Sequence, residues 1–242
     1  MENSALLDTT DMSNIEKKAY FHILCTFDLS KAFIDVMENA RNLVKELLCI
    51  PEDYSILFLQ GGASLEFIMT PLNLMKIDKG RAAYLNTGTW SNKAIKEAKR
   101  VGDVIVVADS SDKNYNYIPK EFDIPKDIDY FHCTSNNTIF GTQIKEFPQV
   151  PSLMVCDMSS DIFSREININ KFDLIYAGAQ KNMGPAGTTL VIVKKSILSK
   201  TGRNIPAMLD YTTHIKKDSM FNTPPVFAVY VSMLTLQWIK EQ

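Results

Sequence analysis

The sequence predicts an α/β fold in which helices flank a mainly parallel β-sheet. Two observations support this prediction. Short apolar runs, of the length of strands, alternate with longer amphipathic segments along the 242-residue chain. The short runs are almost entirely apolar, which is typical of strands covered on both faces, as in parallel sheets. A chain of this length can also bury a sizeable core within one large domain.

The elements follow in chain order. A helix is predicted at Phe33–Leu48, because its apolar residues recur every three or four positions and so share one face. A strand at Tyr54–Leu59 and a helix at Leu65–Leu74, bent at Pro71, come next. The remaining prediction comprises strands at Ala82–Leu85, Val104–Val107, Tyr130–Cys133, Leu153–Cys156, Leu174–Ala177 and Thr189–Val193, helices at Ser91–Arg100 and Val226–Lys240, and a loop at Asp109–Lys126.

The composition excludes several classes of protein. The 26 basic and 28 acidic residues give a formal charge of −2, so we expect neither nucleic acid nor an anionic membrane as a partner. Residues 1–18 contain no apolar signal segment, and no apolar run is long enough to span a bilayer. The four cysteines form no metal-binding pattern, and we expect Cys133 and Cys156 to be buried. A cytoplasmic protein without a metal site is therefore expected.

The most informative stretch of the chain follows the apolar segment Phe172–Tyr176, where small residues surround Lys181. A lysine held at a strand end can lose part of its hydration, which frees its amine for Schiff-base chemistry. The strand before it ends on Asp157. Pyridoxal phosphate requires such a pair, a lysine that forms the imine and an acid that keeps the ring nitrogen protonated. Each residue also has a plainer interpretation: Lys181 as a solvated surface lysine, and Asp157 as a cap.

Other strand ends offer groups that suit the same cofactor. The turn Gln60–Ser64 leads into a helix, whose free backbone amides favour a phosphate. Trp90 could stack on a flat ring, and Asn136–Thr138 offers a hydroxyl and amides. Structural turns and a packed tryptophan remain the alternatives. The carboxyl ends of parallel strands meet at one edge of a sheet, so the agreement of five strand ends favours a cofactor site.

Six motifs in this order resemble the phosphoserine aminotransferases, class-V members of the fold-type I pyridoxal phosphate enzymes. They are Gly61–Ser64, Gly88–Ser91, Asn136–Gly141, Asp157–Ser160, Ala177–Asn182 and Phe221–Pro225. The similarity extends from Phe33 to the C-terminus. It implies amino transfer between O-phospho-L-serine and 2-oxoglutarate in serine biosynthesis, and 4-phosphohydroxythreonine as a second substrate for vitamin B6 synthesis.

The resemblance also implies a role for each matched residue near the cofactor ring. Lys181 would form the imine and move the substrate proton. Asp157 would pair with the ring nitrogen. Trp90 would stack on the ring, and Thr138 would bind its phenolic oxygen.

The cofactor phosphate would be bound from two subunits, according to the same resemblance. Ala63, Ser64 and Gln180 would bind it from one chain. Asn222 and Thr223 would reach it from the neighbouring subunit, so a homodimer with shared active sites is implied.

The chain departs from this family at both ends. Residues 1–30 lack the expected Gly-Pro-rich segment, and the expected His-Arg pair falls at Asp28 and Leu29. Residues 31–242 correspond to the pyridoxal-phosphate-binding large domain, without the small C-terminal domain and its carboxylate-binding arginine. The alternative is therefore a truncated, non-catalytic pyridoxal phosphate binder, in which an apolar surface would be exposed on 226–238. A nucleotide site at Gly61–Ser64 is the weaker alternative, because no dinucleotide or Walker motif is present.

Overall fold

The structure is a computed structural model, and it describes residue 13 and residues 31–242. The predictions for the atypical N-terminal segment, including Asp28 and Leu29, lie outside the described residues. Among the described residues, no helix is both long and apolar enough to span a bilayer.

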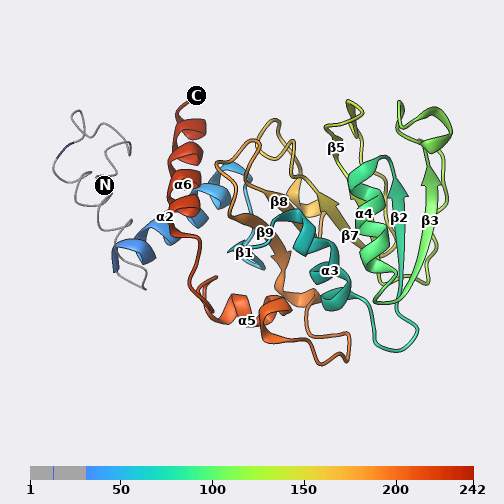
Figure 1. Cartoon of the computed structure of the whole chain (residues 1–242), viewed down its shortest axis with the longest axis horizontal. Coiled ribbons are helices and arrows are strands. Elements are labelled where there is room, and N and C mark those ends of the chain that lie inside the picture. Colours follow the sequence, from blue (N-terminus) through green and yellow to red (C-terminus); the bar gives the residue numbers. More distant parts are fainter. Residues whose placement is uncertain (1–12, 14–30) are drawn as a thin grey trace, which may run out of the picture.

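One seven-stranded sheet forms the centre of the described part of the chain (Figure 1). Its strand order is β1-β9-β8-β7-β4-β2-β3, and only β9 runs against its neighbours. The mainly parallel sheet is thus confirmed. The strands are β1 (Tyr54–Leu59), β2 (Arg81–Asn86), β3 (Asp103–Asp109), β4 (Tyr130–Thr134), β7 (Leu153–Asp157), β8 (Leu174–Gly178) and β9 (Thr189–Lys194), and a separate small hairpin contains β5 (Asn136–Asn137) and β6 (Thr142–Gln143).

Helices cover both faces of this sheet. The structure contains α2 (Lys31–Leu47), α3 (Gly62–Leu74), α4 (Thr89–Ala98), α5 (Tyr211–Lys216) and α6 (Val226–Glu241). The four predicted helices are confirmed, but α3 begins three residues earlier than expected and continues through Pro71. The short helix α5 was not predicted. Helices α2 and α6 pack against each other, and α3 packs against α4 (Figure 1).

Alternating strand residues separate the core into two clusters. One face packs against α2, α6 and long loops; it includes Phe131, Ile175 and Ile192. The opposite face packs against α3 and α4; it includes Tyr130, Tyr176 and Val191. This period of two, with both sets buried, is the pattern of a sheet covered on both sides. The face of Tyr176 is the one that carries the candidate site.

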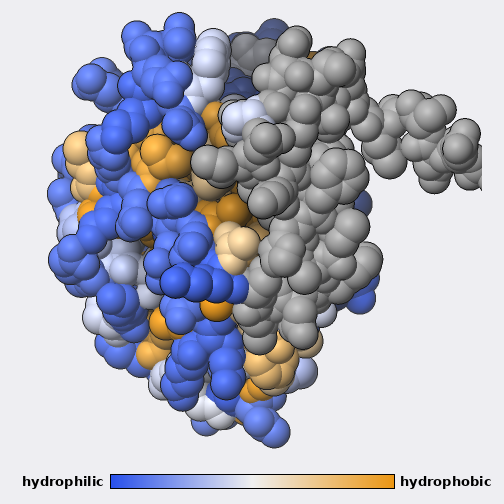
Figure 2. All heavy atoms as spheres, turned by 90° about the vertical axis from the view of Figure 1, so that its left-hand side faces the viewer, coloured by the Kyte–Doolittle hydropathy of each residue, from blue (hydrophilic) through white to orange (hydrophobic). Residues whose placement is uncertain are grey.

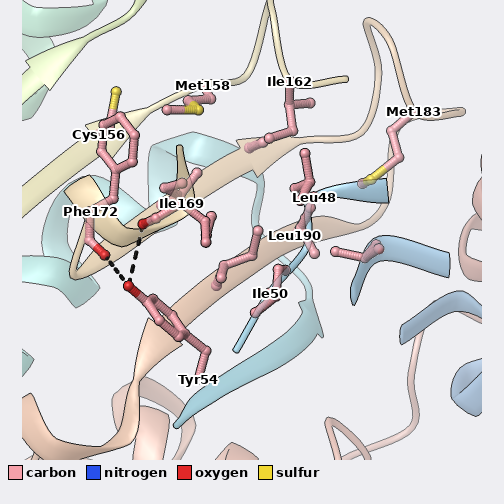
Figure 3. Close-up of a cluster of buried hydrophobic side chains, with 14 of the residues drawn as sticks. Leu48, Ile50, Tyr54, Cys156, Met158, Ile162, Ile169, Phe172, Met183 and Leu190 are labelled. Carbon is pink, nitrogen blue, oxygen red and sulfur yellow. Dashed lines mark hydrogen bonds between the residues drawn. The ribbon is translucent and has the colours of Figure 1, made fainter. Parts of the chain in front are cut away.

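Tyr54 fixes the start of the edge strand β1 to the segment before β8 (Figure 3). Its hydroxyl lies 2.7 Å from the carbonyl oxygen of Phe172 and 3.3 Å from that of Ile169. Around it, Leu48, Ile50 and Leu190 fill the space between α2 and the sheet (Figure 3). The ring is therefore buried while its polar oxygen keeps a partner.

Cys133 and Cys156 are buried side by side on paired strands, as expected, with sulfur atoms 3.7 Å apart. In contrast, α6 exposes large apolar side chains: Phe227 is 46%, Leu234 is 42% and Trp238 is 60% accessible. Hydrophobic residues reach the surface on this side of the molecule (Figure 2). The apolar surface expected on 226–238 is thus present.

Candidate active site

The candidate site lies at the edge of the sheet where the parallel strands have their carboxyl ends. Strands β1, β2, β4, β7 and β8 all run in the same direction, so the loops that follow them meet at this edge. Asp157 is the last residue of β7, and Lys181 follows the end of the adjacent strand β8. The strand order thus brings the predicted lysine and acid to neighbouring positions.

Helix α3 presents its N-terminus at this edge. Gly61, with φ of 93°, and Gly62, with φ of 65°, form the left-handed turn that joins β1 to the helix. A Cβ atom on Gly61 would lie 2.5 Å from the Cβ of Leu65, so only glycine fits there. No side chain caps α3. The amides of the first turn, which includes Ala63 and Ser64, can therefore bind an anion such as a phosphate.

Lys181 points toward two of the predicted residues. Its Nζ atom donates a hydrogen bond to the Oγ1 of Thr138 at 3.1 Å and lies 5.9 Å from the centre of the Trp90 ring. Both Lys181 and Thr138 are solvent-exposed, which leaves the amine open to an incoming ligand. The structure therefore brings Lys181, Thr138 and Trp90 together.

Trp90 is held in the first turn of α4 and is half-buried. Its Nε1 atom is buried and has no hydrogen-bond partner among the described residues. On the ring, the Nζ of Lys93 lies 4.5 Å from the centre. An aromatic face near the Lys181 amine is suited to stacking on a planar ligand.

Asp157 is a buried carboxylate, only 3% exposed. Its Oδ1 accepts a hydrogen bond from the backbone N–H of Ser159 at 2.9 Å. Burial raises the pKa of Asp157, while hydrogen bonds from Ser159 and the positive charge of Lys181 lower it. Asp157 thus caps the segment that follows it, as the plainer interpretation expects. The nearby Lys181 charge also makes this carboxylate a candidate for binding a cofactor.

The loop that carries Thr138 is fixed to the turn after β2. The Nδ2 of Asn137 donates hydrogen bonds to the Oγ1 of Thr87 at 3.1 Å and of Thr142 at 3.2 Å. Gly88 lies so close that a Cβ there would be 2.9 Å from the Oδ1 of Asn137. This contact brings the loop after β4 next to the helix that carries Trp90.

The remaining predicted residues lie around this centre. Gln180 is exposed next to Lys181, and its side chain folds back over Gly178. Thr223 is exposed, and its backbone carbonyl accepts a hydrogen bond from the Nε2 of Gln60 at 2.7 Å. Asn222 is half-buried beside it. Thr223 thus contacts the turn before α3, and the role of both residues across a subunit interface stays a prediction.

The sequence interpretation missed the role of Ser159. Its hydroxyl accepts a hydrogen bond from the N–H of Gly178 at 3.0 Å, while its own backbone N–H binds Asp157. A serine two residues after a strand-end aspartate is a common local turn pattern, and this pattern could have pointed to the bond between the Ser159 N–H and Asp157.

The arrangement fits pyridoxal phosphate. It offers an amine at Lys181, a buried carboxylate at Asp157, the aromatic face of Trp90 and the uncapped N-terminus of α3 at one sheet edge. Among the described residues, no cluster of three or more His, Cys, Asp or Glu side chains could hold a metal ion.

This sheet, with a lysine and an acid at its carboxyl edge, is the large domain of a fold-type I pyridoxal-phosphate-dependent transferase. The chain belongs to the class-V aminotransferase family, whose profile matches residues 11–242. The family resemblance found in the motifs is therefore confirmed.

Curated relatives agree with this assignment. The phosphoserine aminotransferase of Flavobacterium psychrophilum is 67% identical over 212 residues, which are 87% of this chain and 59% of that protein. That of Parabacteroides distasonis is 58% identical over 213 residues, 88% of this chain and 59% of that protein. The chain thus spans about 59% of the length of these relatives.

Solved structures show the same fold. A phosphoserine aminotransferase from Trichomonas vaginalis with bound pyridoxal phosphate has a TM-score of 0.85 and 33% identity, over 93% of this chain and 67% of that one. The enzyme from Bacillus circulans subsp. alkalophilus has a TM-score of 0.86 and 42% identity, over 90% of this chain and 61% of that one.

Proposed function

We propose that residues 31–242 form a pyridoxal-phosphate-binding large domain whose function is amino transfer from O-phospho-L-serine to 2-oxoglutarate, reversibly, in serine biosynthesis. The observation that carries the proposal is the position of the Lys181 amine, 3.1 Å from Thr138 and 5.9 Å from the centre of the Trp90 ring, beside the buried Asp157. The names of the relatives support the choice of phosphoserine. We include in the same proposal 4-phosphohydroxythreonine as a second substrate and a cytoplasmic location for the protein.

When bound, pyridoxal phosphate supplies an aldehyde that bonds to amines and a ring that takes up electrons from the substrate carbon. Lys181 provides the amine for covalent attachment. Because Lys181 is exposed and reaches over the sheet edge, the same amine can carry a proton to and from the substrate. Thr138 holds that amine in place through its hydroxyl.

Asp157 would hold a proton at the ring nitrogen. A carboxylate exerts the strongest attraction on such a cation where water is excluded, and Asp157 is 3% exposed. Trp90 would orient the ring by stacking and exclude water from one face of it.

The phosphate would lie at the N-terminus of α3, with the amides of Ala63 and Ser64 and the side chain of Gln180 as donors. We propose that Asn222 and Thr223 of the partner subunit complete this site in a homodimer. Sedimentation that yields only monomer, at concentrations where the cofactor is bound, would remove these two residues from the site.

The test of cofactor binding is covalent trapping on the full chain. Addition of pyridoxal phosphate should produce a visible absorption band, and borohydride reduction followed by peptide mass mapping should locate the adduct on Lys181. The variant Lys181→Ala should show neither, and Lys93→Ala, which alters the other lysine near Trp90, should retain both. An adduct at another lysine, or at none, would sink the proposal.

A non-catalytic cofactor binder remains the second candidate, and the exposed Phe227, Leu234 and Trp238 on α6 favour it. The two candidates differ in their response to substrate. Phosphoserine should convert the unreduced, coloured form to the pyridoxamine form in an active transferase. If the band forms but phosphoserine leaves it unchanged while the longer relatives respond, the non-catalytic function is the correct one.

A further inference from the structure

Ser159 connects the two strands that carry the candidate acid and lysine. Its backbone N–H donates to the Oδ1 of Asp157 at 2.9 Å, and its hydroxyl accepts from the N–H of Gly178 at 3.0 Å. Asp157 ends β7 and Gly178 ends β8. Ser159 is 8% exposed, so little water competes for these bonds.

The Ser159 hydroxyl accepts one hydrogen bond and still has its own proton to donate. A serine hydroxyl has one proton to donate and two lone pairs that accept. The Gly178 N–H occupies a lone pair, so the proton remains available to the Asp157 carboxylate. The hydrogen bond from the Ser159 side chain lowers the pKa of Asp157, against the larger effect of burial. Ser159 thus favours the charged carboxylate through the bond from its backbone N–H and through the effect of its hydroxyl.

The same contacts extend the connection between the strands. The ladder of β7 and β8 ends with the pair Asp157 and Tyr176. Beyond it, the N–H of Met158 donates to the carbonyl of Tyr176 at 2.9 Å, and the Ser159–Gly178 bond follows. The backbone that leads to Lys181 is therefore held at a fixed place relative to the acid.

We infer that Ser159 is a positioning residue, which orients the Asp157 carboxylate and ties it to the strand that presents Lys181. The consequence of this inference for amino transfer rests on the proposed function. The contacts of Ser159 themselves can be tested without a cofactor.

Several charged or titratable groups face Asp157 besides Ser159. Lys181 favours the charged carboxylate. Four acidic groups interact electrostatically with the Asp157 carboxylate: Asp161, Glu66, Tyr176 and Cys156. Because burial and these acidic groups act against the charge, loss of the Ser159 hydroxyl should have a clear effect.

The primary experiment is a carbon-13 NMR titration of aspartate carboxyl groups in the full chain without cofactor. Asp157→Asn assigns the signal by removing it. In Ser159→Ala this signal should titrate about one pH unit higher, a tenfold change in acid dissociation, because the carboxylate loses the favourable effect of the hydroxyl and its tie to Gly178. Ser164→Ala is the matched control, since its hydroxyl binds only the backbone carbonyl of Asp161. An unchanged midpoint in Ser159→Ala would overturn the inference.

Two further measurements keep the test decisive. Should Ser159→Ala not fold, Ser159→Cys keeps a side chain of similar shape with a weaker donor and should raise the midpoint by a smaller amount. An unchanged midpoint would equally contradict the inference. With pyridoxal phosphate added, the pH profile of the visible band should change in Ser159→Ala and not in Ser164→Ala. A wild-type protein without a band would refute the proposed function, while the titration would still decide the role of Ser159.

Discussion

The Nζ atom of Lys181 donates a 3.1 Å hydrogen bond to the Oγ1 of Thr138, although β7 lies between the strands that precede these two residues. The lysine side chain and the loop after β4 therefore meet near the end of β7, where Asp157 is buried. This meeting point is consistent with the effect of the exposed amine on the pKa of a carboxylate that water hardly reaches.

Removal of the Thr138 hydroxyl should weaken cofactor binding. Thr138→Val keeps the shape of the side chain but removes the hydroxyl that would bind the phenolic oxygen of the cofactor, in place of the Lys181 amine that it binds without cofactor. A hydrogen bond to a charged group contributes about 1.5–3 kcal/mol, so we expect roughly a tenfold or greater rise in the dissociation constant for pyridoxal phosphate. Spectroscopic titration measures it. Thr142→Val, which removes only an acceptor for Asn137, should bind like the wild type; equal affinities in all three proteins would contradict the role of Thr138.

Tryptophan fluorescence should report cofactor binding through one residue. The chain contains two tryptophans, Trp90 beside Lys181 and Trp238 on the exposed side of α6. Stacking on the cofactor ring should quench Trp90 only. Quenching on addition of pyridoxal phosphate should therefore persist in Trp238→Phe and disappear in Trp90→Phe. The reverse result would place the ring elsewhere.

The turn before α3 should tolerate no side chain at Gly61. In Gly61→Ala the new Cβ would lie 2.5 Å from the Cβ of Leu65, in a backbone with φ of 93°. Gly62→Ala is the matched variant, since its φ is also positive but no atom lies within 4 Å of the added Cβ. The left-handed conformation alone costs about 1 kcal/mol, so Gly61→Ala should lose clearly more in urea unfolding. Equal losses would show that the clash is relieved.

Glu66 should make the protein less stable as the pH rises. Its carboxyl is fully buried and accepts a hydrogen bond from the hydroxyl of Tyr211, and burial raises its pKa to about 8 from 4.5. Below pH 4.5 both the folded and the unfolded states hold the proton. Between these values the unfolded state ionises first, so the free energy of unfolding falls, by roughly 3–5 kcal/mol in total.

Glu66→Gln cannot ionise and should remove most of this decline. The measurement is the free energy of unfolding in denaturant at several pH values between 4.5 and 8. Glu166→Gln, at an exposed position, serves as the control and should keep the wild-type slope. A Glu66→Gln protein with the wild-type slope would mean that Glu66 does not titrate in this range.

The sequence was sufficient to predict the parts of the site that depend on strand ends. Strands apolar on both faces imply a parallel sheet, and a parallel sheet brings its carboxyl ends to one edge. Asp157 and Lys181 could be placed together on this basis, and the glycine pair before α3 could be interpreted as an anion-binding turn.

Other features could not be predicted for physical reasons. An apolar strand has the same residue pattern in either direction, so the antiparallel course of β9 left no signal. Helix α5 has six residues, fewer than two turns, and depends on the Asp210 side chain that caps it. The contact of Ser159 with Gly178 joins separate strands, and a sequence pattern within one segment cannot reveal such a contact.

The position of β1 at the border of the sheet has a consequence for how the protein folds during synthesis. Among the described residues its sole partner in the sheet is β9, with Leu59 opposite Thr189 and Tyr54 opposite Lys194. The ribosome must therefore make the chain as far as β9, Thr189–Lys194, before β1 can be paired. Contacts between such distant segments slow folding. The glycine turn after β1 consequently reaches its final geometry late, and a vitamin-derived ligand that needs this turn would stabilise only the finished sheet.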